Sequence, residues 1–458
     1  MKMLLIDFGS TYTKVALVSL DPPGLLATAQ APTTVESDLM EGLETALESF
    51  STAQLNGVTA RRACSSAAGG LRIVAVGLVP GLTVKAAREA ALGAGARVLS
   101  AYGYTLNQEE IDEIYNLKPD LLLLAGGTDG GNRQVILENA ARIADARLAV
   151  PVIVAGNKSA AYEAASLLEG KVPRVVVTGN VMPEVNRLQV EPARKAIREL
   201  YLSEITRARG LEKIQQQVGL VMPTPLAVMQ AGELYWKDTG KEVIIVDLGG
   251  ATTDIHSFAD GRPRGGGRIV KGPPEPLVKR SVEGDLGLRV SLSALLTVIP
   301  PEEVVKELPF VAETEELLGY VRNIASSRAL LPRNNRERAY DGAIAVCAIR
   351  EALRRHAGYL TETYTPEGRL WVQEGKDLTG VAAVIATGGA LIQGDNPGLV
   401  LKAGLAQKDP RVLSPRSPQI LIDRAYLLAT VGLLAEEWPE VARAVLRETL
   451  LPLGGIAG

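Results

Sequence analysis

Two aspartates, Asp7 and Asp247, each end an apolar run and are followed by a glycine turn rich in hydroxyl residues. The glycines let the backbone turn tightly and approach a ligand closely. Backbone N–H groups and threonine hydroxyls in such a turn can cradle a phosphate. The carboxylate at the strand end, joined in the second motif by Asp254, can hold a hydrated Mg²⁺ beside it. A hairpin tip without a ligand shows the same local pattern, so one motif alone leaves both interpretations open.

A third glycine turn, Thr387-Gly388-Gly389-Ala390, follows the apolar run 381–386. Two aspartate hairpins that face each other across a cleft can grip a polyphosphate and share one Mg²⁺ between Asp7 and Asp247. The third turn lacks large side chains and would leave room for a flat base. Together, the order and spacing of the three motifs favour a nucleotide site over plain hairpin tips.

Length and composition are those of an ordinary globular protein with more than one domain. The chain has 458 residues, of which 47% are apolar and 22% charged, and this length predicts two or three domains. A formal net charge of -3 gives no electrostatic case for a nucleic acid or an acidic membrane surface as partner. Uninterrupted apolar stretches fall short of the roughly 20 residues of a membrane span. We expect a cytoplasmic protein with no nucleic-acid or membrane partner, and the sequence does not predict its oligomeric state.

Cysteine and histidine are scarce, which argues against several kinds of site. Cys64 and Cys347 are the only cysteines, as suits a reducing compartment, and they exclude a disulfide scaffold or a cysteine-rich zinc site. The two histidines, His256 and His356, argue against a His-based metal site or a Ser-His-Asp triad. We expect His356 to be solvated, because it follows two arginines in a basic helical run.

Apolar periodicity places the motifs on strands of an α/β protein. The first motif predicts a hairpin that ends in a turn at 21–24. Between residues 71 and 178, strands and helices alternate, which predicts a self-contained parallel sheet inserted into a larger fold. A long amphipathic helix is expected from Glu191, and a shorter helix over 223–234 leads to the strand at Val243. The strands expected in the insertion span 72–77, 97–102, 120–125, 150–155 and 174–178.

The loop Gly126–Asn132 contains four glycines and directly follows a predicted buried strand. Ligands of open α/β sheets sit at the carboxyl ends of strands, so this loop could bind a small anion or contact a partner. A glycine-rich turn with no ligand explains the same residues.

The three motifs together resemble the actin-like ATPase superfamily, which includes actin, sugar kinases and the seventy-kilodalton heat-shock chaperones. Asp7–Lys14 looks like the phosphate-1 motif, Asp247–Asp254 like the phosphate-2 motif and Ile385–Ala390 like the adenosine motif. The 223–234 helix is similar to the first interdomain connecting helix, and Gly284–Gly287 to a chaperone segment after phosphate-2. The resemblance implies an α/β fold of two actin-like, ribonuclease-H-like lobes around a nucleotide cleft, with an inserted open α/β domain.

A closer resemblance covers nearly the whole chain, and it is to the glutamate mutase accessory proteins, the GlmL or MutL family. This family is unrelated to the mismatch-repair protein MutL. The resemblance implies a chaperone-like reactivating ATPase, dependent on ATP and Mg²⁺, that exchanges damaged cobalamin on an adenosylcobalamin-dependent mutase, either glutamate mutase or a related aminomutase. The segments that carry the resemblance are 8–14, 65–71, 124–131, 178–183 and 282–287.

The same resemblance implies a division of the chain and the roles of individual residues. Residues 1–70 would begin lobe I, 71–215 would form the inserted region and long helix, 216–415 the connecting helix and lobe II, and 416–458 helices that return to lobe I. The inserted region is the part expected to touch the mutase. Asp7 and Asp247 would be the catalytic residues and would hold Mg²⁺ through water. The residues expected to contact the nucleotide are Gly9, Ser10, Thr11, Thr13, Lys14, Gly249, Gly250, Ala251, Thr252, Thr253, Gly388 and Gly389.

One departure from the chaperone pattern concerns the attacking water. In those proteins a glutamate precedes the Pro-Thr pair of the connecting helix and helps to position the water, whereas Met222 stands here. We therefore expect slow hydrolysis, or assistance from another acid such as Glu184 or Glu191.

Two other functions remain open on the same fold. A small-molecule kinase would use a carboxylate to deprotonate an acceptor hydroxyl. A reductive activator of acyl-CoA dehydratases, whose phosphate-1 motif also resembles Gly-Ser-Thr-x-Thr-Lys, would need an iron–sulfur cluster between subunits. Cys64 and Cys347 lack the close spacing of cluster ligands, so the sequence argues against the activator.

Overall fold

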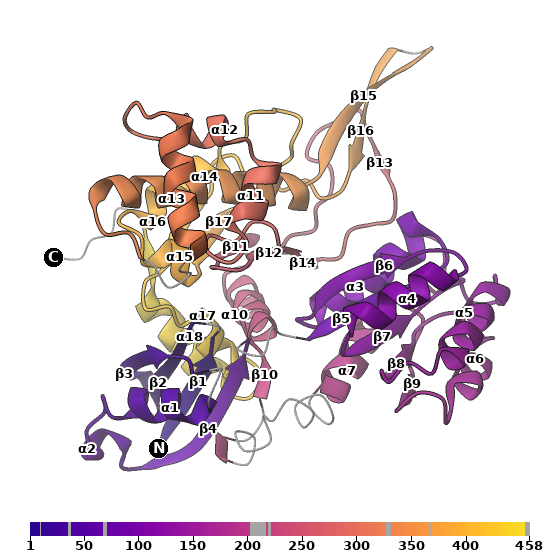
Figure 1. The fold of residues 1–458 in the computed structure, drawn as a ribbon, viewed down its shortest axis with the longest axis horizontal. Helices are drawn as coiled ribbons and strands as arrows, with labels where there is room; N and C mark the ends of the chain where they lie inside the picture. The colour runs from indigo at the N-terminus through magenta and orange to yellow at the C-terminus, as the bar shows by residue number, and fades with distance from the viewer. Residues whose placement is uncertain are drawn as a thin grey trace. The chain divides into compact units, whose positions relative to one another are not determined.

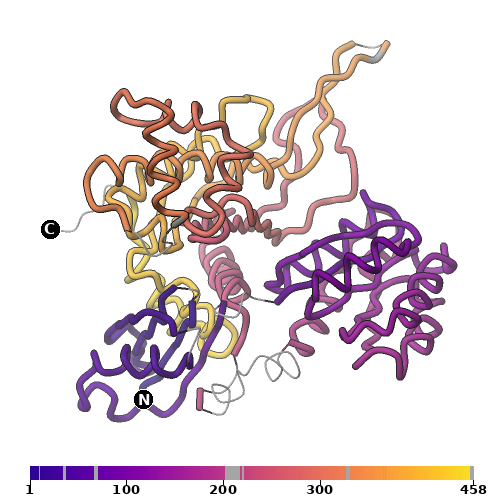
Figure 2. Tube along the Cα trace, in the orientation of Figure 1, coloured from indigo at the N-terminus to yellow at the C-terminus, as the bar shows by residue number. Residues whose placement is uncertain are grey.

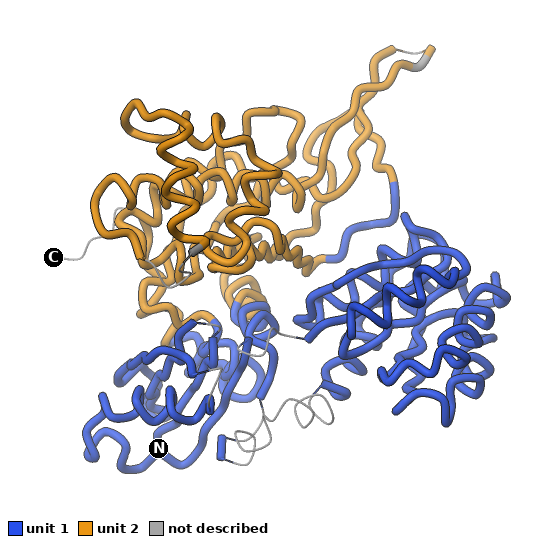
Figure 3. The backbone as a smooth tube through the Cα atoms, viewed as in Figure 1, with its two compact units in different colours: residues 1–231, 272–276, 429–444 blue, residues 232–271, 277–428, 445–458 orange. Residues whose placement is uncertain are grey.

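The computed structural model describes residues 1–9, 11–34, 38–66, 71–201, 217–218, 221–326, 331–366 and 368–453. The chain divides into two compact units, coloured separately in Figure 3. Unit 1 comprises residues 1–231, 272–276 and 429–444, and unit 2 comprises residues 232–271, 277–428 and 445–458.

The N-terminal sheet of unit 1 has the strand order β10-β4-β1-β2-β3. Strands β1 to β3 form an antiparallel meander, and β4 and β10 run parallel to β1. The turn expected at 21–24 is shorter than predicted, because β3 already begins at Pro23. One face of β1 packs Leu4, Ile6 and Phe8 against α1, in keeping with the period of two. The elements are β1 (Lys2–Phe8), β2 (Tyr12–Leu20), β3 (Pro23–Pro32), α1 (Leu39–Leu47), α2 (Thr52–Leu55), β4 (Val58–Ser65) and β10 (Val221–Pro223).

The inserted domain of unit 1 has a parallel sheet of order β6-β5-β7-β8-β9, which confirms the predicted open α/β domain. Separate apolar clusters cover its two faces, one including α3 and α7 and the other α4, α5 and α6 (Figure 1). Residues Leu121–Leu124 are fully buried because both faces are covered. The elements are β5 (Arg72–Val76), a π-helical turn (Pro80–Val84), α3 (Lys85–Gly93), β6 (Arg97–Tyr102), α4 (Gln108–Leu117), β7 (Leu121–Leu124), α5 (Gln134–Asp145), β8 (Val152–Val154), α6 (Ala161–Leu168), β9 (Val175–Val177) and α7 (Glu191–Leu200).

The main sheet of unit 2 repeats the topology of the N-terminal sheet. Its order is β14-β12-β11-β17-β18-β19. β11, β12 and β14 form an antiparallel meander, and β17 and β18 run parallel to β11. Two sheets of one topology confirm the predicted pair of actin-like, ribonuclease-H-like lobes. The strands are β11 (Val243–Leu248), β12 (Thr253–Phe258), β14 (Val278–Glu283), β17 (Ala383–Thr387), β18 (Gln419–Asp423) and β19 (Leu450–Pro452).

Helices, chiefly the long helix α14, cover the face of this sheet that contains Ile244 and Val246, and together they build a hydrophobic core in unit 2. A separate three-stranded sheet, β13-β16-β15, was not predicted. The elements are α11 (Leu292–Val298), α12 (Pro301–Val305), α13 (Thr314–Ser326), α14 (Asn335–His356), α15 (Gly389–Ile392), α16 (Pro397–Leu405), β13 (Arg268–Lys271), β15 (Tyr359–Thr365) and β16 (Gly368–Glu374).

Helix α10 (Thr224–Thr239) belongs to both units, which divide between Ala231 and Gly232. Figure 2 shows it as a continuous coil. A Cβ on Gly232 would lie 2.4 Å from Phe258, and one on Gly432 would lie 1.8 Å from the Ala227 carbonyl oxygen, so glycine permits close packing of each half of the helix. Helices α17 (Leu428–Gly432) and α18 (Pro439–Thr449) follow near the end of the chain. Among the helices that the structure describes, none has the length and apolar character needed to cross a membrane.

Candidate functional site

Asp7 sits on β1 directly opposite Lys14 on β2, and the two side chains form a buried ion pair. Lys14 Nζ lies 2.6 Å from Asp7 Oδ2, with the side chains 8% and 2% exposed. Register alone brings them together, because directly opposed residues of neighbouring strands point to the same face of a sheet. Burial makes each charge dependent on the other.

Two further donors reach the other oxygen of Asp7. Thr224 Oγ1 donates to Asp7 Oδ1 over 2.8 Å, and Cys64 Sγ lies 3.4 Å from the same atom. Burial raises the pKa of the Cys64 thiol well above its usual value, and the charge of Asp7 raises it further. Cys64 is therefore a neutral donor, and Asp7 is fixed from β2, β4 and the first residue of α10. The sequence did not reveal these two contacts.

The turn after Asp7 is closed by a hydrogen bond from the Gly9 N–H to the Tyr12 carbonyl oxygen, 3.1 Å long. A Cβ on Gly9 would lie 2.7 Å from that oxygen, so the turn requires glycine. Thr11 is exposed, whereas Ser10 lies outside the described residues. Thr13 is on the opposite face from Lys14, and its hydroxyl shares a 3.1 Å hydrogen bond with Thr33.

Unit 2 contains a turn of the same construction after Asp247. The Gly249 N–H donates to the Thr252 carbonyl oxygen over 2.9 Å, which repeats the spacing of the bond between Gly9 and Tyr12. Within the described residues, the N–H groups of Gly250 and Ala251 donate no hydrogen bond. Such successive free N–H groups form a concavity suited to an anion.

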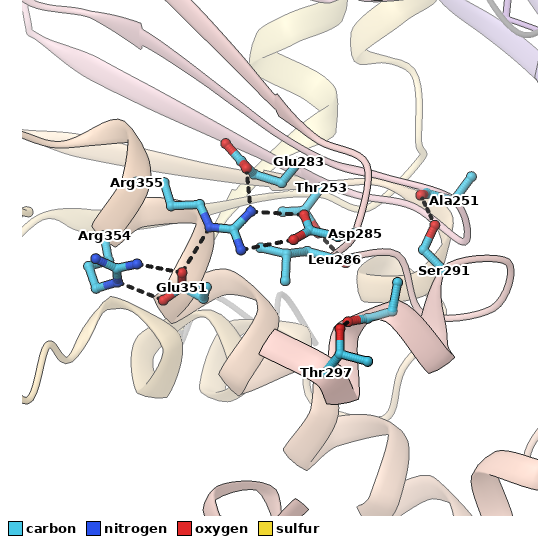
Figure 4. Close-up of polar contacts among 11 residues, drawn as sticks. Ala251, Thr253, Glu283, Asp285, Leu286, Ser291, Thr297, Glu351, Arg354 and Arg355 are labelled. Atoms are coloured by element: carbon cyan, nitrogen blue, oxygen red, sulfur yellow. Dashed lines mark hydrogen bonds and ion pairs between the residues drawn. The ribbon is translucent and has the colours of Figure 1, made fainter. Parts of the chain in front are cut away.

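The segment 286–291 forms hydrogen bonds with this turn and with the adjoining Thr253, as Figure 4 shows for Thr253 and Ser291. Thr253 Oγ1 donates to the Leu286 carbonyl oxygen and Ser291 Oγ to the Ala251 carbonyl oxygen, each over 2.7 Å. The Arg289 N–H donates to the Gly250 carbonyl oxygen over 2.8 Å. The carbonyl oxygens of Gly250 and Ala251 thus accept hydrogen bonds from this segment, and the Thr253 hydroxyl already donates to it.

Arg355, from the end of α14, anchors the residues just before that segment (Figure 4). Its guanidinium donates to Glu283 over 2.7 Å and to the two oxygens of Asp285 over 2.8 and 2.9 Å. These bonds from Arg355 hold the pKa of Asp285 below its ordinary value. The sequence showed only a basic run at the end of a helix, because the acidic partners lie 70 and 72 positions away.

One expectation about the polar residues of unit 2 was wrong. His356 is not solvated but 0% exposed, since its ring bonds to the Ser281 and Ser257 hydroxyls over 2.8 Å each. Asp254 is buried, and its Oδ2 accepts a hydrogen bond from Arg280 Nη2 over 2.6 Å. These serine and arginine partners lie far away in the sequence, so composition does not reveal them.

The third motif brings Gly388 against Asp247. Strand β17 pairs Thr387 with Asp247, and the chain then turns with Gly388 at a φ of +93°. A Cβ on Gly388 would lie 2.5 Å from Asp247 Oδ1, so glycine alone fits. Gly389 is less crowded, since its Cβ would lie 3.5 Å from Tyr426. In unit 2 the structure therefore assembles Asp247, the Gly249 turn and Gly388.

Glu184 and Glu191, the acids considered for water positioning, belong to the inserted domain. Each pairs with an arginine three residues later, Glu184 with Arg187 at 2.7 Å and Glu191 with Arg194 at 2.6 Å. Met222 lies in β10, half-buried and opposite Cys64. Among the described residues, no group of three or more acidic, histidine or cysteine side chains is arranged to ligate a metal directly.

The family model described as MutL protein matches residues 3–450. The chain belongs to the MutL family. A curated relative, Protein MutL of Clostridium tetanomorphum, is 43% identical over 98% of this chain and 99% of its own length.

Solved structures also align with the chain, at low similarity. An acetone carboxylase is 13% identical, with a TM-score of 0.37, over 94% of this chain and 69% of its own. A diol dehydratase-reactivating factor is 13% identical, with a TM-score of 0.35, over 96% and 100%. Component A of the (R)-2-hydroxyglutaryl-CoA dehydratase of Acidaminococcus fermentans is 11% identical, with a TM-score of 0.32, over 96% and 99%.

Proposed function

We propose that this MutL-family protein is an ATP-dependent, chaperone-like reactivating factor for an adenosylcobalamin-dependent mutase, glutamate mutase or a related aminomutase. The observation that carries the ATP assignment is the duplicated turn, in which an aspartate at a strand end is followed by a glycine whose N–H closes the hairpin. Membership of the MutL family supports the mutase as partner. We place this activity in the cytoplasm.

The residues of each unit fit a nucleotide with Mg²⁺. In unit 2, Asp247 is part-exposed beside the free N–H groups of Gly250 and Ala251, and the space that a Cβ would fill at Gly388 lies against it. We assign phosphate contacts to Gly9, Ser10, Thr11, Lys14, Gly249, Gly250, Ala251 and Thr252, and adenosine contacts to Gly388 and Gly389. The hydroxyls of Thr13 and Thr253 are left out, because each is already bonded within its own unit.

Asp7 and Asp247 are the residues that would hold Mg²⁺, through water rather than directly. When bound, the metal offsets the charge of the phosphates. Asp7 is oriented for this by Lys14, Thr224 and Cys64, and Lys14 adds a positive charge of its own. Because Met222 stands where the chaperones carry a glutamate, we propose a slow ATPase that acts as a switch. Its two nucleotide states must bind the mutase with different affinities.

The structure disfavours the iron–sulfur alternative. Cys64 and Cys347 are both buried, and burial raises the pKa of each thiol, that of Cys347 to about 11. Cluster ligands are thiolates, which both environments oppose.

The decisive experiment measures ATP hydrolysis and the recovery of mutase activity, with and without inactivated mutase. Wild-type protein should restore activity only with ATP and Mg²⁺, and Asp247→Ala should abolish restoration. Asp260→Ala, at an exposed position of unit 2, is the matched control. Full restoration by Asp247→Ala would show the mechanism to be wrong, and ATP turnover that responds to a metabolite instead of the mutase would favour a kinase.

A further inference from the structure

A cavity of about 600 Å³ opens in unit 2 beside the C-terminal half of α16. Its volume lies within the range of small-molecule sites, roughly 300–1,000 Å³. It is at the opposite end of β18 from Asp423, which bonds Thr387 of the third motif, so it is separate from the proposed nucleotide contacts. The lining residues are Lys402, Leu405, Ala406, Gln407, Ser414 to Ile420, Pro452 and Leu453.

Ser414 supplies a hydroxyl to the lining of this cavity. The residue is 1% exposed, and its hydroxyl forms no hydrogen bond with any described residue. The hydroxyl is therefore able to donate to a ligand in the cavity.

Lys402 and Arg416 give the cavity a positive charge. Neither pairs with a carboxylate of the described chain, and the lining contains no aspartate or glutamate. The nearby cations differ, since Lys408 pairs with Glu303 and Arg411 with Asp409. Arg416 Nη2 donates to the Pro410 carbonyl oxygen over 2.9 Å, which restricts the position of the guanidinium.

We propose that this cavity binds a small organic oxyanion, a carboxylate or a phosphate carried on an apolar body. Lys402 and Arg416 attract the anionic group, and the Ser414 hydroxyl donates to it. Leu405, Ile420 and Leu453 contact the apolar body. This site is independent of the proposed ATPase function.

Ligand-observed NMR titrations test the proposal with phenyl phosphate and benzoate as anionic probes and benzyl alcohol as the neutral analogue. Saturating ADP and Mg²⁺ are present throughout, so that the proposed nucleotide site does not compete for the probes. At least one anionic probe should bind tenfold more tightly than benzyl alcohol. Preference for phenyl phosphate would identify a phosphate ligand, and preference for benzoate a carboxylate.

Lys402→Met and Ser414→Ala should each weaken that binding at least fivefold. Lys408→Met, a nearby lysine outside the lining, should leave it unchanged, and thermal melts confirm that each variant is folded. Equal binding of anionic and neutral probes, or wild-type affinity in folded Lys402→Met, would overturn the proposal. Loss of ATP binding with intact probe binding would instead count against the proposed function alone.

Discussion

Thr224, the first residue of helix α10, donates its hydroxyl hydrogen to Oδ1 of Asp7 over 2.8 Å. Helix α10 continues into unit 2, where Gly232 packs against Phe258 and Ile245. Thr224, which orients the Asp7 carboxylate, is thus itself a residue of the helix that both units share. A displacement of the Asp7 side chain can therefore act on α10 through this one hydrogen bond.

Replacing Thr224 with valine should weaken Mg²⁺-dependent ATP binding, because Asp7 loses one of its orienting donors. A hydrogen bond to a charged group contributes about 1.5–3 kcal/mol, so the affinity should fall roughly tenfold or more. Thr224→Ser keeps the hydroxyl and should bind almost as wild type. Titrations with a fluorescent ATP analogue, in Mg²⁺ and in EDTA, separate the two variants. Equal affinities in Mg²⁺ would refute the role of the hydroxyl.

Removal of Lys14 should destabilise unit 1, since it leaves the buried Asp7 carboxylate without its cation. Breaking a buried pair from one side costs about 3–5 kcal/mol. Lys14→Met should therefore lower the urea midpoint of unfolding strongly, and the double variant Lys14→Met, Asp7→Asn should recover part of the loss. No recovery in the double variant would mean that lost packing of the lysine stem, and not the unpaired charge, causes the effect.

Gly388 and Gly389 offer a matched pair of substitutions. Gly388→Ala forces a Cβ to within 2.5 Å of Asp247 Oδ1 at a φ of +93°, so it should displace Asp247 and abolish ATP binding. Gly389→Ala places its Cβ in ordinary contact with Tyr426, so the fold should accept it, and ATP should still bind, although more weakly because Gly389 is assigned as an adenosine contact. Calorimetric titration with ATP measures both variants, and binding of ATP by Gly388→Ala as tight as by Gly389→Ala would contradict the crowding at Gly388.

Arg355 and Arg354 make a second pair, one residue apart on α14. Arg355→Met leaves Glu283 and Asp285 without their shared cation, whereas Arg354→Met loses only an exposed pair with Glu351. Denaturant unfolding should show a clear loss for Arg355→Met and a change within about 0.5 kcal/mol for Arg354→Met. Equal losses would mean that the anchoring of segment 286–291 does not depend on Arg355.

The pH dependence of stability follows from the same contact. Because Arg355 holds the pKa of Asp285 below its ordinary value of 3.8, this carboxylate stabilises the fold above that pH. The contribution is lost as pH falls through the lowered folded-state pKa. Unfolding curves of wild type and Arg355→Met should therefore converge as the solution is acidified below pH 4. A constant difference across this range would rule out the proposed linkage.

The sequence predicted those parts of the fold that depend on local patterns. Apolar runs that end in glycine turns located the hairpins at Asp7 and Asp247, and the alternation of strands and helices located the strands of the inserted sheet. The sequence did not predict contacts between elements that lie far apart in the chain, such as those of His356 with two serines or of Asp254 with Arg280. The β13-β16-β15 sheet was not predicted for the same reason, because β13 and β16 pair across about a hundred residues.

The candidate site was predicted at the level of turns but not of individual side chains. Asp-x-Gly at a strand end is visible in sequence, and both copies fold as closed hairpins. Which face a neighbouring hydroxyl takes depends on strand register, and register placed Thr13 away from Lys14. Thr224 and Cys64 gave no signal because they reach Asp7 only when β4 and β10 pair beside β1.

The duplicated hairpins are alike in backbone but unequal in charge. Asp7 faces a lysine in its register, whereas Asp247 faces the acidic Asp254, whose compensating Arg280 comes from a third strand. The first hairpin therefore carries a neutral ion pair, whereas the second carries two carboxylates and one guanidinium. Under the proposed nucleotide function, the two copies would present different charges to a ligand, although their backbones fold alike.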